Sequence, residues 1–177
     1  MNKKRAIFLD RDGVINKKAK EHDYIKNWGE FEFLPHIANV ISQLNKNFLV
    51  VVVSNQGGIS QGLMTADDVN SIHSNMSSEL KKSNATIDKI YICPHYVKEK
   101  CACRKPEPGL ILQAQKELNI DLLNSYMIGD SFIDIEAGKK AGCKTILLTN
   151  TNVAHKVKPH FTANNILEIA DFIYTNL

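Results

Sequence analysis

The segment Phe48–Val53 (FLVVVV) constrains the fold of this chain more than any other feature of the sequence. All six residues are apolar and four are β-branched, which is typical of a central parallel strand that is buried on both faces. The polar pair Ser54 and Asn55 follows directly, where such a strand would end. Open parallel sheets place their ligands at this edge. The segment therefore predicts an α/β protein with a polar site beyond the strand.

The same alternation of apolar and periodic segments extends along the chain. Short apolar runs predict further strands at Ala6–Leu9, Lys89–Ile92, Tyr126–Ile128 and Thr145–Leu148. Apolar residues at helical spacing predict helices at His36–Asn45, Ala66–Lys81, Pro108–Leu118, Ile133–Ala141 and Asn165–Tyr174. Strands that alternate with helices indicate right-handed βαβ units, and hence a Rossmann-like parallel sheet with helices on both faces. The aperiodic stretches 17–35 and 55–64 are expected to be functional loops.

Size and charge exclude several classes of protein. With 177 residues we expect one domain, 1–177. The net charge of +3 is spread along the chain, which suits an anionic substrate and argues against a nucleic-acid partner. No apolar stretch approaches the ~20 residues of a membrane span. The first residues, MNKKR, do not resemble a cleavable signal. We therefore expect a cytoplasmic protein with no membrane partner.

Two carboxylates follow the first predicted strand, in the sequence IFLDRDGVIN. If the strand continues through Arg11, then Asp10 and Asp12 leave its tip on the same face. The alternative is that they only cap a turn, as Asp-Gly pairs often do.

Further polar groups follow the other strands: Ser54, then Lys105, then Asp130 and Asp134. If they converge, the carboxylates repel one another by about 4 kcal/mol per pair at ~4 Å and an effective dielectric near 20. A Mg²⁺ ion relieves this repulsion and also neutralises phosphate oxygens. Ser54 and Lys105 could hold the remaining phosphate oxygens. One carboxylate is then free to act as a nucleophile and another as a general acid and base.

The four motifs DRDGV (10–14), SNQ (54–56), RKP (104–106) and GDSFID (129–134) resemble those of the haloacid dehalogenase superfamily of phosphatases. The resemblance implies that Asp10 is the nucleophile and Asp12 the general acid and base. It implies that Ser54 and Lys105 stabilise the phosphoryl group, and that Mg²⁺ is bound by Asp10, the Asp12 backbone carbonyl and Asp130. For Asp134 it leaves two roles open, as a partner of the metal ligands or as a structural residue.

A second cluster lies in the loop 93–103 and comprises Cys93, His95, Cys101 and Cys103. Three thiolates and one imidazole form the ligand set of a closed, structural Zn²⁺ site. The alternative is a group of free, partly buried cysteines. Because the loop leads directly into Arg104 and Lys105, bound zinc would fix the position of that lysine. The fourth cysteine, at position 143, is expected in the core.

The sequences CPH and CxCRKP resemble the branch of the superfamily that contains the histidinol-phosphate and D,D-heptose 1,7-bisphosphate phosphatases. This branch has a structural zinc and no cap domain. The 43 residues between Asp10 and Ser54 agree with a capless form, for which we expect a monomer.

The variable loops favour a heptose bisphosphate as substrate. HDY (22–24), FEF (31–33), NQGGISQG (55–62) and PEPG (106–109) resemble the heptose enzymes, whereas the five residues between His95 and Cys101 resemble the histidinol enzymes. We expect a Mg²⁺-dependent phosphatase that removes the 7-phosphate of D-glycero-D-manno-heptose 1,7-bisphosphate. By resemblance, it would serve nucleotide-activated heptose synthesis for lipopolysaccharide or other surface glycans. The alternatives are a histidinol-phosphate phosphatase and a non-catalytic zinc-loop binding module.

Substrate contacts are expected from the loops around the motifs. The expected residues are Arg11, His22, Asp23, Tyr24, Asn55, Gln56, Gly57 and Arg104. Lys17, Lys18 and Lys20 either contribute cations for a second phosphate or form a solvated surface run.

Overall fold

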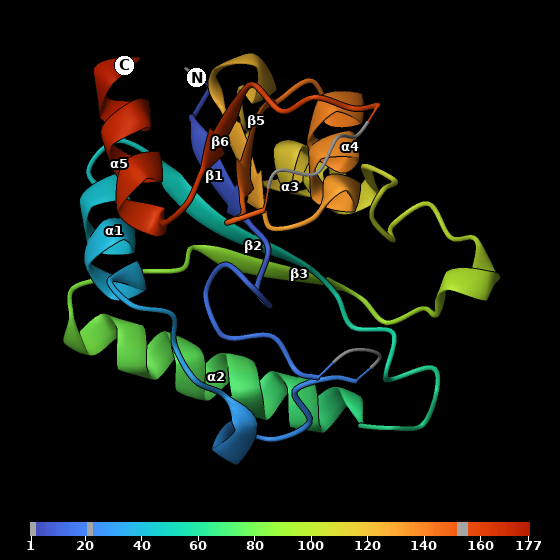
Figure 1. The fold of residues 1–177 in the computed structure, drawn as a ribbon. Coiled ribbons are helices and arrows are strands. Elements are labelled where there is room, and N and C mark those ends of the chain that lie inside the picture. Colours follow the sequence, from blue (N-terminus) through green and yellow to red (C-terminus); the bar gives the residue numbers. More distant parts are fainter. Residues whose placement is uncertain (1–2, 21–22, 152–155) are drawn as a thin grey trace.

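The computed structural model describes residues 3–20, 23–151 and 156–177. Its centre is a six-stranded, entirely parallel sheet in the order β3-β2-β1-β4-β5-β6 (Figure 1). The strands are β1 (Ala6–Leu9), β2 (Leu49–Asn55), β3 (Lys89–Cys93), β4 (Tyr126–Gly129), β5 (Lys144–Leu148) and β6 (Phe161–Ala163). The predicted parallel sheet is confirmed. The sequence did not predict β6, because its three residues FTA form no apolar run.

In the part of the chain that the structure describes, five α-helices connect and cover the strands. They are α1 (Ile37–Leu44), α2 (Ala66–Lys82), α3 (Gly109–Leu118), α4 (Phe132–Ala141) and α5 (Ile166–Thr175). Short 3₁₀ helices occur at Trp28–Glu30, Val97–Glu99 and Leu122–Asn124. All five predicted helices are present, with ends that differ by at most one residue. None of the described helices is long and apolar enough to cross a membrane.

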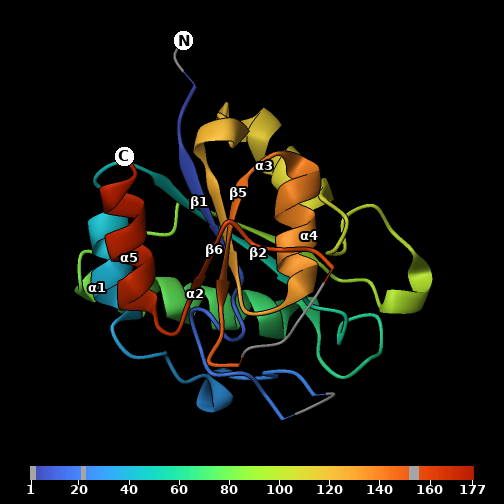
Figure 2. The same cartoon turned by 45° about the horizontal axis from the view of Figure 1, so that its top comes forward.

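The sheet separates two hydrophobic cores. Figure 2 shows α1 and α5 on one side of the strands and α3 and α4 on the other. Ile7 and Leu9 of β1 face α1, α2 and α5, whereas Ala6 and Phe8 face α3 and α4. This alternation follows from the two-residue period of a strand. All four residues of β1 are completely buried, so both faces of this strand are covered. Helices on both faces of the sheet are therefore confirmed.

The strand order places a topological switch point between β1 and β4. The chain builds β2 and β3 outward on one side of β1 and then returns to build β4, β5 and β6 on the other. Loops that leave β1 and β4 run in opposite directions, which opens a crevice at the carboxyl ends of these two strands.

The segment after β1 differs from the expected extension of the strand. The strand ends at Leu9, and the Arg11 carbonyl accepts hydrogen bonds from the backbone N–H groups of Ile15 and Asn16 at 2.8 and 3.1 Å. The segment 11–16 is thus a tight turn. Gly13 has φ +95°, a left-handed conformation that favours glycine, and a Cβ atom there would lie 1.8 Å from Oδ2 of Asp130.

Helix caps fix the segments that carry site residues. Thr65 caps α2 and forms a reciprocal capping box with Asp68. Ser131 and Asp134 form the same arrangement at the start of α4, directly beyond β4. Gly142, at φ +90°, ends α4.

Candidate active site

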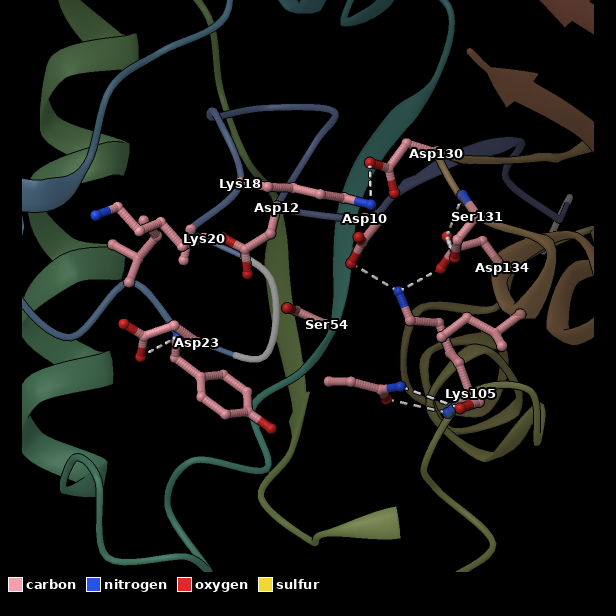
Figure 3. Close-up of a pocket in the computed structure, with 15 residues that line it drawn as sticks. Asp10, Asp12, Lys18, Lys20, Asp23, Ser54, Lys105, Asp130, Ser131 and Asp134 are labelled. Atoms are coloured by element: carbon pink, nitrogen blue, oxygen red, sulfur yellow. Dashed lines mark hydrogen bonds and ion pairs between the residues drawn. The ribbon is translucent and has the colours of Figure 1, made fainter. Parts of the chain in front are cut away.

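A cavity of about 380 Å³ opens at the switch point between β1 and β4 (Figure 3). Side chains from the carboxyl ends of β1, β2 and β4 line it, together with the loop after the first motif. The lining residues are Asp10, Asp12, Lys18, Ala19, Lys20, Asp23, Tyr24, Ile25, Ser54, Asn55, Lys105, Asp130, Ser131, Ile133 and Asp134. Residues of all four sequence motifs therefore meet in one cavity.

Lys105 is held by two hydrogen bonds, to Asp10 and to the Val53 carbonyl, and by an ion pair with Asp134. Its Nζ lies 2.7 Å from Oδ1 of Asp10, 2.7 Å from Oδ1 of Asp134 and 2.8 Å from the Val53 carbonyl oxygen. Only 3% of the residue is exposed. Although burial opposes its charge, Asp10 and Asp134 raise the pKa of Lys105 above its ordinary value. The ammonium is therefore a fixed positive charge beside Asp10.

Asp10 is an unusual carboxylate because of its burial. Burial raises its pKa to about 7, and the nearby carboxylates of Asp134 and Asp12 act in the same direction. The positive charge of Lys105 lowers the pKa but does not outweigh the burial. A carboxylate with a pKa near 7 is only partly ionised at neutral pH. A further positive charge at this position would lower the pKa and keep Asp10 in its nucleophilic form.

The carboxylates of Asp10, Asp130 and Asp134 have the donor set of a site for a hard divalent cation. Oxygen atoms of the three side chains all lie within 4.8 Å of one another. Carboxylate oxygens are the preferred ligands of Mg²⁺, which retains several water molecules and needs only a few protein ligands. The residues fit this ion. Lys18 supplies a positive charge at the same place, with its Nζ 2.6 Å from Oδ2 of Asp130.

Asp134, whose role the sequence left open, is 1% exposed and joins two parts of the site. One of its oxygens pairs with Lys105, and the other accepts hydrogen bonds from the Ser131 hydroxyl at 2.6 Å and backbone N–H at 3.2 Å. It therefore links the capping box of α4 to the lysine.

Asp12 and Ser54 lie on the opposite side of Asp10 from Asp130 (Figure 3). Gln56 connects them, because its Nε2 donates to the Ser54 Oγ at 2.8 Å and to Oδ2 of Asp12 at 3.2 Å. Gln56 itself is completely buried and does not line the cavity, so its side chain organises the site rather than facing the substrate.

Arg11 requires a correction. We expected it to contact the substrate, but its side chain is completely buried and lies outside the cavity lining. The turn after β1 directs the guanidinium toward its neighbour Asp12, at 2.9 Å, and toward His73 of α2, at 3.3 Å. This contact could not be predicted from the sequence, because His73 has no motif around it and reaches Arg11 only through the tertiary fold.

The remaining expected contacts occupy the outer part of the site. Asp23, Tyr24 and Asn55 line the cavity. Gly57 lies beside it, where an added Cβ would meet Arg104 Nη1 at 3.0 Å and the Tyr24 hydroxyl at 3.2 Å. The prediction for His22 falls outside the described residues. Of the three lysines, Lys18 and Lys20 line the cavity, whereas Lys17 forms an exposed ion pair with Glu32.

The four predicted zinc ligands converge in the loop between β3 and α3. Cys93 Sγ lies 3.4 Å from Cys101 Sγ, 3.2 Å from Cys103 Sγ and 3.5 Å from His95 Nδ1. Cys103 Sγ lies 3.3 Å from both Cys101 Sγ and His95 Nδ1. A tetrahedron with Zn–S bonds of about 2.3 Å has edges of roughly 3.5–3.8 Å. The cluster is slightly tighter than this tetrahedron and fits zinc. Cys143 is buried in the core, as expected.

The loop 93–103, which carries the cysteine cluster, is connected to the lysine of the site. Asn55 of β2 makes two hydrogen bonds to the backbone of Lys105, each 3.0 Å long. Its Oδ1 accepts from the Lys105 N–H, and its Nδ2 donates to the Lys105 carbonyl. Next to it, Arg104 donates from Nη1 to the His95 carbonyl at 2.8 Å. The position of Lys105 thus depends on both β2 and the cysteine cluster.

Comparisons with known proteins agree with this geometry. A family model of HAD-like hydrolases matches residues 102–169. A D,D-heptose 1,7-bisphosphate phosphatase from B. bronchiseptica, crystallised with magnesium and phosphate, is 28% identical and superposes with a TM-score of 0.88 over 98% of this chain and 99% of its own. The fold and the site define a HAD-like phosphohydrolase.

Curated relatives identify the family within that class. The D-glycero-beta-D-manno-heptose-1,7-bisphosphate 7-phosphatase of Haemophilus ducreyi is 35% identical over 96% of this chain and 98% of its own length. The D-glycero-alpha-D-manno-heptose-1,7-bisphosphate 7-phosphatase of Campylobacter jejuni is 40% identical over 84% of each chain. The chain belongs to the D-glycero-D-manno-heptose-1,7-bisphosphate 7-phosphatase family.

Proposed function

We propose that this chain hydrolyses the 7-phosphate of D-glycero-D-manno-heptose 1,7-bisphosphate, with residues 1–177 acting as one catalytic domain. One observation carries the proposal: the carboxylate of Asp10, whose side chain is only 13% exposed, lies 2.7 Å from the Lys105 ammonium, in a cavity that also contains Asp12, Ser54 and Asp130. A nucleophile, a proton-transfer group and phosphate-binding charges are the parts that phosphoryl transfer requires.

In the first step, an oxygen of Asp10 attacks phosphorus and forms an aspartyl-phosphate. The bond from phosphorus to the O7 atom of the sugar breaks, and Asp12 donates a proton to that oxygen. In the second step, Asp12 removes a proton from water, which attacks phosphorus and releases inorganic phosphate together with free Asp10. The Ser54 hydroxyl and the Lys105 ammonium hold the phosphoryl oxygens in both steps.

Asp10, Asp130 and the Asp12 backbone carbonyl would hold Mg²⁺, which would neutralise charge on the phosphoryl oxygens. Asp134 supports this arrangement by pairing with Lys105. Cys93, His95, Cys101 and Cys103 would hold a structural Zn²⁺ that fixes the loop before Lys105.

The outer residues would recognise the rest of the sugar bisphosphate. Asp23, Tyr24 and Asn55 offer hydrogen bonds to hydroxyl groups, and Lys20 and Arg104 offer charge to the 1-phosphate. His22 and Gly57 stay in this proposal as predicted contacts. The setting that we propose is cytoplasmic, as a monomer, in nucleotide-activated heptose synthesis for lipopolysaccharide or other surface glycans.

A substrate screen tests the proposal. Phosphate release would be measured from the α and β anomers of the heptose bisphosphate and from histidinol phosphate, at equal concentrations and with Mg²⁺. We expect a preference of at least about tenfold for one heptose anomer over histidinol phosphate, since a site built for a second phosphate discriminates against a substrate that lacks it. A preference for histidinol phosphate would overturn the substrate assignment but keep the chemistry.

A further inference from the structure

A buried cation next to the acid–base group is unexplained by the reaction itself. Arg11 is the bulkiest of the described side chains that are completely buried. A guanidinium is expensive to bury unless its donors and its charge are matched. Its Nη2 and Nε donate to Asp12 at distances of 2.9 to 3.2 Å. Asp12 thus receives the Nε–Nη2 edge of the guanidinium.

The other edge of Arg11 binds His73. Its Nη1 lies 3.3 Å from His73 Nε2. Arginine can only donate, so Nε2 must accept and the imidazole must be neutral with its proton on Nδ1. Burial, and secondarily the charge of Arg11, lowers the pKa of His73 to about 4, which agrees with the neutral form.

His73 is fixed in place by the fold. It lies on the buried side of α2, with Val69 and Met76 on the same face, and only 7% of it is exposed. Because the ring is enclosed on this buried face of α2, it restricts the plane in which the guanidinium of Arg11 can lie. A planar, five-donor group that is fixed at one edge presents its other edge in a defined orientation.

Asp12 therefore takes its orientation from Arg11. Both of its oxygens accept from the guanidinium, and Asn16 Nδ2 and Gln56 Nε2 complete the set at 2.9 and 3.2 Å. The exposed part of the carboxylate can then face only the cavity, where the leaving oxygen of the substrate would lie.

We propose that Arg11 and His73 form a positioning pair that aims the Asp12 carboxyl at the leaving-group oxygen. The pair contacts neither substrate nor metal. This inference rests on the proposed phosphatase function, and specifically on Asp12 as its general acid. It predicts that substitutions in the pair lower kcat/KM only for substrates whose leaving oxygen needs a proton.

Aryl phosphates test the pair directly. p-Nitrophenyl phosphate has a good leaving group that departs without protonation, whereas phenyl phosphate has a poor one that needs it. The measured quantity is kcat/KM, which covers only the steps up to departure of the phenol. The variant His73→Leu removes the acceptor but keeps the volume of the side chain. For this variant we expect kcat/KM to fall about tenfold with phenyl phosphate and less than twofold with p-nitrophenyl phosphate. The tenfold loss is smaller than the roughly 10²–10⁴ that a general acid contributes, because Asp12 is still present.

Two further variants separate positioning from folding. His73→Gln restores an acceptor oxygen and should recover most of the phenyl phosphate activity, whereas Met76→Leu on the same helix face should leave the ratio of the two substrates unchanged. Equal losses on both substrates in His73→Leu, or a His73→Gln variant as impaired as His73→Leu, would refute the pair and leave a structural role. Arg11→Lys, which keeps the charge and loses the fork, should show the same substrate ratio as His73→Leu.

The outcomes also distinguish this inference from the proposed function. A wild-type chain that cleaves aryl phosphates but not the heptose bisphosphate would overturn the substrate alone, and the His73 comparison would still decide the pair. A wild-type chain that cleaves none of these phosphates would refute both.

Discussion

The raised pKa of Asp10 predicts that magnesium binding depends strongly on pH. Burial raises the pKa of this carboxyl to about 7, from an ordinary value of 3.8. A proton and a cation compete for the same oxygens, so affinity should fall as the pH falls through 7. The ionised fraction of such a group is about nine-tenths at pH 8 and one-tenth at pH 6, so the Kd for Mg²⁺ should rise about tenfold between these values. Burial also raises the pKa of Asp130, which acts in the same direction.

Isothermal titration calorimetry measures this effect without turnover. Titrations of Mg²⁺ at pH 6 in two buffers with different ionisation enthalpies should show release of about 0.9 proton per ion, because most Asp10 carboxyls are protonated there. The Asp10→Asn variant should bind more weakly and release fewer protons, since its amide does not titrate. A Kd that changes less than twofold from pH 8 to pH 6, with no proton release, would refute the argument, because an aspartate with an ordinary pKa is fully ionised at both values.

Three further predictions concern the nucleophile, the zinc loop and the core. Asp10→Asn should lower phosphate release at least about a thousandfold while circular dichroism stays unchanged, and retained turnover would exclude Asp10 as the nucleophile. Cys103→Ser should reduce bound zinc, measured by metal analysis, from about one equivalent to less than half, whereas Cys143→Ala should keep it; equal zinc in both variants would contradict the assigned ligands. Phe8→Ala should cost about 3–5 kcal/mol in denaturant unfolding, because Phe8 is completely buried, and Leu123→Ala, at a position 74% exposed, should stay within about 0.5 kcal/mol; similar costs would disprove the assigned core.

The features that the sequence predicted well are those with a local cause. The apolar run of β2 requires burial on both faces wherever it lies, and the helical stripes of α1 and α2 need an apolar surface to cover. The cysteines converge because they are close in sequence. Each of these conclusions depends on neighbours within a few residues, which a single sequence displays.

The features that it could not predict depend on distant partners. Nothing near His73 indicates that its ring meets Arg11, 62 positions away. We expected Arg11 to contact the substrate, whereas the turn at 11–16 directs its side chain inward. Strand β6 is only three residues long, and it is a strand because β5 offers it an edge. In each case the tertiary fold, rather than local preference, decides the outcome.

The placement of Lys105 has a consequence for how the protein matures. Its partner Asp10 lies 95 positions earlier in the chain, and the two are brought together by β1, β2 and the loop 93–103. During synthesis, Asp10 leaves the ribosome long before Lys105, which supplies the positive charge beside it. A nascent or truncated chain that ends before residue 105 would therefore carry the DRDGV motif without phosphatase competence. Phosphatase activity should therefore appear only when the sheet has folded with Lys105 in place, and the DRDGV motif alone should not confer it.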